Sequence, residues 1–147
     1  MREYLKIIKY ENKPLIGSMF FKFSYQPFNE KKLETLKKEY KLLGVTRPAK
    51  NEFEKILLIM GWVNSRWKIG FPHNVSYNFD ALDILRRARN GEQFFCSEYV
   101  TTYIQSLSSL GITARYVGLF KGHAISEVWS DDFDKWIAMD PTYNIYY

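Results

Sequence analysis

The sequence predicts an α+β domain in which one helix packs across an antiparallel sheet. Apolar side chains recur every three to four residues over positions 96–110, which places them on one helical face, and Gly111 follows as a stop. Three apolar segments come next, at 114–120, 123–129 and 135–139, joined by short polar or glycine-containing stretches. Such segments are typical of successive antiparallel strands.

Three further helices are expected ahead of this unit. Residues 29–44 carry an apolar stripe at three-to-four spacing that ends at a glycine. Residues 51–66 are too broadly apolar for a surface helix, so this helix is expected to be central. Residues 70–78 contain proline and turn formers and predict a loop, after which an aspartate opens a helix over 80–89. The stripe of the first helix comprises Leu33, Leu36, Tyr40 and Leu43.

A chain of 147 residues has the usual size of one domain, and 46% hydrophobic residues are sufficient for one core. We expect a single domain over residues 1–147, with 51–147 as its core. Residues 1–50 then form an N-terminal extension of strands and helix. Within this extension, residues 4–10 and 15–25 are rich in aromatic and β-branched side chains and predict two strands.

The net charge of +5 is unevenly distributed along the chain. Residues 1–50 carry 12 Lys and Arg against 5 Asp and Glu, whereas residues 51–147 carry 9 against 11. The lysines of the first part lie between apolar positions, as on the solvated face of a helix or strand, so we expect no nucleic-acid partner. A basic nucleic-acid binder, the alternative, would show salt-sensitive retention on heparin through residues 1–50.

The small number of cysteines and histidines limits the possible metal chemistry. Cys96 is the only cysteine, which excludes an internal disulfide and a cysteine-based zinc site. His73 lies in a predicted loop, and with one further histidine in the chain we expect no metal and no cofactor. No stretch approaches the roughly 18 apolar residues of a membrane span, and no signal peptide is visible. A cytoplasmic location is favoured unless the chain is a fragment of an exported protein, and the oligomeric state stays open.

Three side chains stand where thiol chemistry would need them. Cys96 opens the predicted helix 96–110, and the free backbone N–H groups of a helix N-terminus favour the reactive thiolate and can receive an oxyanion. His123 begins a strand just after a glycine-containing turn, where an imidazole can project toward that helix. Asp140 follows the strand 135–139 and could orient the imidazole.

Each of these residues also has a simpler interpretation. A lone cysteine on an apolar helix face is often an inert core residue. His123 could be a satisfied strand histidine, and Asp140, which precedes a proline, could simply start a turn. Periodicity does not decide among these alternatives.

Residues 91–142 resemble the transglutaminase-like superfamily. That family shows a glycine shortly before a helix headed by cysteine, a Leu-Gly-Ile-x-x-Arg segment, a His-Ala strand, and a strand containing tryptophan that ends in Asp-Pro-Thr. The matching residues are Gly91, Cys96, Leu110-Gly111-Ile112-Thr113-Ala114-Arg115, His123-Ala124, Trp136 and Asp140-Pro141-Thr142.

The resemblance implies a papain-like fold on which Cys96 is the nucleophile, His123 the base and then the acid, and Asp140 the orienting carboxylate. It implies an enzyme that attacks amide carbonyls of a protein or peptide substrate through a thioester, as a peptidase or amidase. Two alternatives stay open. One is a protein-glutamine transglutaminase, and the other is a non-catalytic module of the same fold that binds a peptide or glycan.

The second oxyanion donor does not follow from the resemblance, because Phe94 and Phe95 stand where many members have a glycine beside the nucleophile. The amide of Gln93 or the indole N–H of Trp62 or Trp67 could serve. Aromatic side chains are also expected to line a substrate groove. The groove candidates are Phe95, Trp67 and Trp129.

Overall fold

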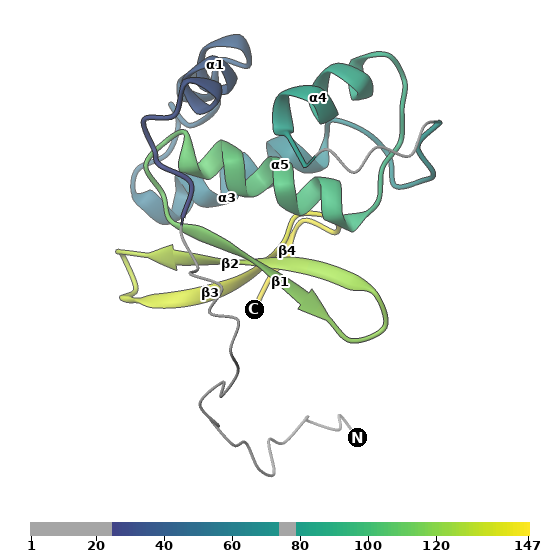
Figure 1. Ribbon diagram of the computed structural model, residues 1–147. Coiled ribbons are helices and arrows are strands. Elements are labelled where there is room, and N and C mark those ends of the chain that lie inside the picture. The colour runs from purple at the N-terminus through teal and green to yellow at the C-terminus, as the bar shows by residue number, and fades with distance from the viewer. Residues whose placement is uncertain (1–24, 74–78) are drawn as a thin grey trace, which may run out of the picture.

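The computed structural model describes residues 25–73 and 79–147 and arranges them as a layer of helices on one face of a sheet (Figure 1). The helices are α1 (Lys31–Glu39), α2 (Leu42–Val45), α3 (Glu52–Asn64), α4 (Ala81–Arg89) and α5 (Cys96–Ser108). The strands are β1 (Ala114–Leu119), β2 (His123–Ser130), β3 (Lys135–Asp140) and β4 (Ile145–Tyr146). They pair antiparallel in the order β1-β2-β3-β4. The predicted α+β class is confirmed.

Helix α5 is the centre of the fold, because α3, α4, β1 and β2 all pack against it. It lies directly over the sheet in Figure 1. The fully buried Tyr103 joins it to α3 by donating its hydroxyl to the carbonyl of Ile56 at 3.2 Å. On the sheet side, Val128 of β2 is also fully buried. The N-terminus of α5 is therefore fixed relative to both layers.

The capped helices begin where the sequence predicts them. Asn51 accepts a hydrogen bond from the N–H of Glu54 at 2.8 Å and so opens α3. Asp80 does the same for α4 through the N–H groups of Leu82 and Asp83. Burial alone would raise the pKa of Asp80, but the hydrogen bond from Lys32 and those backbone donors outweigh it and lower the pKa.

The single helix predicted over residues 29–44 is wrong in its second half. α1 ends at Glu39, and Lys41 takes a left-handed conformation with φ +51° before α2 begins. This break shifts the apolar phase by one residue, so that Leu42 is fully buried whereas Leu43 is 66% exposed. A periodic pattern carries no signal for a left-handed residue at a lysine, where that conformation is rare.

The remaining expectations divide between described and undescribed residues. The strands predicted over 4–10 and 15–25 lie outside the described residues, except for Tyr25, which is in no strand. Residues 70–73 of the predicted loop form neither helix nor strand. In the part of the chain that the structure describes, no helix has both the length and the apolar character needed to cross a bilayer.

Candidate active site

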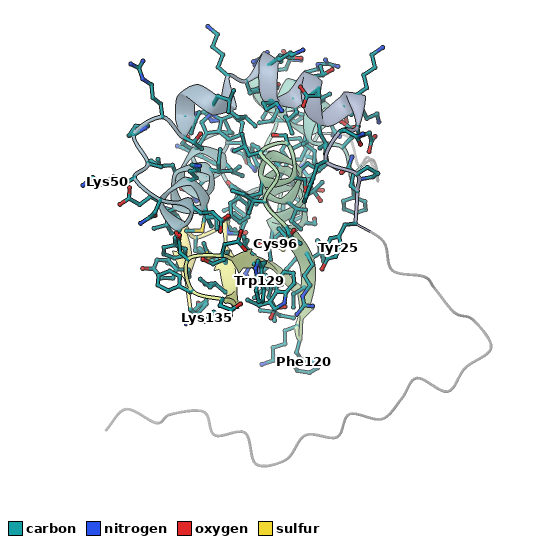
Figure 2. All side chains as sticks on the ribbon, turned by 90° about the vertical axis from the view of Figure 1, so that its left-hand side faces the viewer. Tyr25, Lys50, Cys96, Phe120, Trp129 and Lys135 are labelled. Carbon is teal, nitrogen blue, oxygen red and sulfur yellow. The ribbon has the colours of Figure 1, made fainter. Side chains whose placement is uncertain are left out.

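Cys96 is the first residue of α5 and stands at the junction of the helical layer and the sheet (Figure 2). Phe95 precedes it in an extended conformation, so the chain enters the helix by a sharp turn. The backbone just upstream is fixed, because the N–H of Gly70 donates to the carbonyl of the buried Phe94 at 3.1 Å. The first N–H groups of α5 have no partner within the helix, and the side chain of the N-cap residue Phe95 does not cap them.

His123 and Asp140 meet at one end of the sheet. His123 is the first residue of β2 and Asp140 the last of β3, and antiparallel neighbours bring such positions to the same edge. His123 Nε2 lies 2.7 Å from Asp140 Oδ2, the distance of a charge-assisted hydrogen bond. Asp140 is only 3% exposed, so this carboxylate is shielded from competing water.

The two oxygens of Asp140 have separate partners. Oδ2 faces the imidazole, and Oδ1 accepts hydrogen bonds from the N–H groups of Thr142 at 3.0 Å and Tyr143 at 3.4 Å. Asn64 at the end of α3 holds the same turn by donating to the carbonyl of Thr142 at 2.9 Å. Asp140 therefore starts a turn and also forms a hydrogen bond with the imidazole of His123.

The thiol of Cys96 lies at this same end of the sheet. Its Sγ is 3.9 Å from the carbonyl oxygen of Gly122, the residue directly before His123. Gly122 has φ +80° in the turn between β1 and β2, a conformation that favours glycine. Tyr116 of β1 lies close enough to Cys96 for an electrostatic interaction. Burial raises the pKa of Tyr116, and the nearby negative charges of Cys96 and Glu98 raise it further.

Tyr143 covers one side of the imidazole. Its ring centroid lies 5.7 Å from that of His123, with the planes tilted by 44°. The backbone N–H of the same residue binds Asp140. One residue thus fixes the carboxylate and packs against the histidine that the carboxylate orients.

The hydrogen bond to Asp140 determines which ring nitrogen of His123 carries the proton. As a carboxylate, Asp140 accepts from Nε2–H of His123, which leaves Nδ1 of the ring as the nitrogen able to take the thiol proton. The thiolate of Cys96 would then lie at a helix N-terminus, where negative charge is favoured. Among the described residues, no group of three or more His, Cys, Asp or Glu side chains is arranged to hold a metal ion.

Two of the weaker predictions lie beside the site. Phe95, next to Cys96, is 38% exposed and packs edge-to-face on Phe71 with ring centroids 4.8 Å apart. This position of Phe95 beside Cys96 is compatible with the wall of a substrate groove. Gln93 is exposed, and its amide lies against Gly70, where any Cβ would collide with it. Both assignments stay predictions.

The three candidate tryptophans differ in their surroundings. Trp62 packs on Tyr40, at a centroid distance of 5.8 Å, on the side of α3 that faces the end of α1. Trp67 is 8% exposed and packs in the core against Phe94 at 5.5 Å, so it is not placed to wall an open groove. Its indole Nε1 is buried without a hydrogen-bond partner in the described part of the chain. Trp129 is six residues along β2 from His123, about 20 Å at the usual rise of a strand, too far to line the site.

Sequence reasoning missed the contributions of Tyr116, Tyr143 and Asn64. Tyr143 had a local signal, since it directly follows the Asp-Pro-Thr segment and so lies in the turn that Asp140 starts. Asn64 had none, because it reaches the site through a contact across 77 to 78 residues of chain.

The described fold and site define an α+β protein with a cysteine at a helix N-terminus beside a histidine and an aspartate on adjacent strands. In a comparison with protein-family models, the one that describes the transglutaminase-like superfamily matches residues 41–141 of the sequence. The chain belongs to this superfamily, and the resemblance read from its motifs is confirmed.

Two solved structures have a similar fold. A candidate cysteine protease from Cytophaga hutchinsonii superposes with a TM-score of 0.58 and 20% sequence identity over 84% of this chain and 41% of its own. A TGase superposes with a TM-score of 0.52 and 18% identity over 76% of this chain and 31% of its own. The chain thus spans about two fifths and one third of the lengths of these proteins. Among curated proteins, no significant match was found.

Proposed function

We propose that the protein is a cysteine-dependent hydrolase that attacks amide carbonyls, either a peptide bond or the carboxamide of glutamine. One observation carries this proposal. The 2.7 Å contact of His123 with the buried Asp140 stands at the same sheet end as the thiol of Cys96, whose Sγ approaches the residue before that histidine. A nucleophile, a base and an orienting acid in this arrangement support covalent catalysis.

The reaction would run in two halves. Nδ1 of His123 takes the proton of the Cys96 thiol, and Sγ adds to the carbonyl carbon of the substrate. The oxyanion lies at the N-terminus of α5, where the N–H of Cys96 is one donor. The C–N bond then breaks, the leaving amine or ammonia takes the proton from His123, and a thioester remains on sulfur.

Water resolves the thioester in the second half. His123 takes a proton from the attacking water and returns it to sulfur as the C–S bond breaks, which releases a carboxylic acid and restores the thiol. Asp140 stabilises the imidazolium formed in each half, through the hydrogen bond to Nε2. The indole N–H of Trp67, buried and without a partner among the described residues, supports an assignment as second oxyanion donor better than the contacts of Trp62 do.

A peptide library tests the proposal. The wild-type protein and the Cys96→Ala variant are incubated with the same mixture of glutamine-containing peptides, and products are identified by mass spectrometry. We expect new peptide termini or deamidated glutamine with the wild-type protein and neither with the variant. Equal products from both proteins, or none from the wild type while the chain is folded, would overturn the proposal.

A second arm of the experiment distinguishes hydrolysis from transamidation. A labelled primary amine is added to the same mixture, because an amine that resolves the thioester gives a crosslink whereas water gives an acid. We expect the acid to dominate. Incorporation of the label in preference to hydrolysis would reverse that ranking and favour a transglutaminase. A non-catalytic binding module would retain its binding and its biological activity in the Cys96→Ala variant.

A further inference from the structure

A cavity of about 490 Å³ lies along the flank of α5, between that helix and β1. Its size falls within the range of ligand pockets, roughly 300–1,000 Å³. It contains no charged side chain among the described residues that line it. These residues are Gln26, Phe79, Thr101, Ile104, Gln105 and Tyr116.

The polar ends of the lining already have partners. The Gln105 amide donates to the carbonyl of Phe79 at 3.1 Å and accepts from the N–H of Ala81 at 2.8 Å. The Gln26 amide donates to Glu30 at 2.7 Å. An occupant of the cavity would therefore meet mainly the apolar surfaces of the lining. A charged occupant would lose its hydration there without gaining a partner of opposite charge.

Tyr116 is shared between the cavity and the surroundings of Cys96. It lines the cavity and also lies close enough to Cys96 for the two groups to interact electrostatically. Along α5, Thr101 follows Cys96 by five residues and Gln105 by nine, which corresponds to about 7 to 13 Å at the rise of a helix. An extended peptide covers that distance in two to four residues.

We propose that this cavity is a subsite for a bulky apolar side chain of a peptide substrate, located two to four residues from the carbonyl that Cys96 attacks. The inference rests on the proposed function for its catalytic consequence. It commits to an aromatic or large aliphatic side chain because Phe79, Ile104 and Tyr116 provide the contact surface and no lining residue among those described carries charge.

The test uses octapeptides in which each position in turn is Phe, Leu, Ala or Lys. Turnover is measured with the wild-type protein, and binding is measured with the Cys96→Ala variant by fluorescence anisotropy. We expect Phe or Leu at one position within the stated distance to raise kcat/KM by about tenfold or more over Ala, since burying such a side chain is worth about that factor. Lys at that position should fall below Ala.

A matched pair of variants assigns the preference to the cavity. Phe79 and Phe133 are 54% and 52% exposed, and only Phe79 lines the cavity. Phe79→Ala should reduce the ratio of kcat/KM for the Phe peptide to kcat/KM for the Ala peptide several-fold. Phe133→Ala should retain the full preference. A preference that survives Phe79→Ala, or no preference at any position, would overturn the assignment.

The binding arm separates this inference from the proposed function. If the wild-type protein turns over no peptide, the proposed function fails. Peptide binding to the Cys96→Ala variant then still tests whether the cavity is a subsite. The subsite is supported if the Cys96→Ala variant binds the Phe peptide more tightly than the Ala peptide and if this difference is lost when Phe79→Ala is added. Equal binding of the two peptides would overturn it.

Discussion

Replacement of Asp140 by asparagine tests how the site controls the proton. The Oδ1 position accepts from two backbone N–H groups, those of Thr142 and Tyr143. These donors will hold the asparagine oxygen there and turn its NH₂ group toward Nε2 of His123. Because an NH₂ group donates, Nε2 must become an acceptor and the ring proton must move to Nδ1, the position that should receive the thiol proton.

The size of the effect follows from the lost hydrogen bond. A hydrogen bond to a charged group is worth about 1.5–3 kcal/mol, and each 1.36 kcal/mol is a factor of ten. The imidazolium of His123 formed with the Cys96 thiolate should therefore be disfavoured by about tenfold to a hundredfold in Asp140→Asn. The fraction of reactive thiolate near pH 6 should fall by the same factor.

Alkylation by iodoacetamide measures that fraction without any knowledge of the substrate. Cys96 is the only cysteine, so the mass change reports one site. At about pH 6 the variant should react about tenfold to a hundredfold more slowly than the wild type. At about pH 10, where an ordinary thiol is ionised, the two rates should converge.

The control for this experiment is Asp134→Asn. Asp134 is exposed in the turn between β2 and β3 with φ +50°, a conformation that asparagine adopts well. This variant should alkylate like the wild type at both pH values. If Asp140→Asn also matches the wild type near pH 6 while it remains folded, the assigned role of Asp140 is refuted.

Three further substitutions have distinct expected results. Tyr143→Ala exposes the imidazole of His123 to water and should lower kcat/KM about three- to tenfold, yet it should leave the melting temperature nearly unchanged because Tyr143 is 60% exposed. Leu107→Ala, at a fully buried position of α5, should lower the free energy of unfolding in urea by about 2–5 kcal/mol; a loss below about 1 kcal/mol would contradict the packing. Asp80→Ala removes the cap of α4 and should cost about 1 kcal/mol at neutral pH. Since the folded pKa of Asp80 lies below its unfolded value, this advantage is present above the unfolded pKa and lost as the pH falls through the folded one, so urea midpoints of wild type and variant should converge in acid.

Much of the fold was predictable from local patterns. The helical period of α5 and the apolar segments of β1, β2 and β3 are each long enough to be recognised in the sequence. The meeting of His123 and Asp140 also followed from strand order, since one begins a strand and the other ends its antiparallel neighbour. The two-residue β4 is too short for a periodic pattern and was missed.

Other features depend on geometry that the sequence does not encode locally. The left-handed Lys41 divides what reads as one apolar stripe, and the residue type of Lys41 gives no signal for this conformation. A tryptophan such as Trp67 can line a groove or pack in the core, and the local sequence does not decide between the two. The burial of Trp67 depends on Phe94 and Tyr99, which come from the far side of the undescribed segment 74–78.

An acyl-enzyme on sulfur is the most direct test of the claim that Cys96 is the nucleophile. A turned-over peptide, or its activated ester, is mixed with the protein, quenched in acid and examined by intact mass. We expect an adduct with the mass of the acyl group on the wild-type protein, removed by hydroxylamine as a thioester is, and absent from Cys96→Ala. Turnover with no adduct under rapid quench, or an adduct that persists in Cys96→Ala, would contradict that claim.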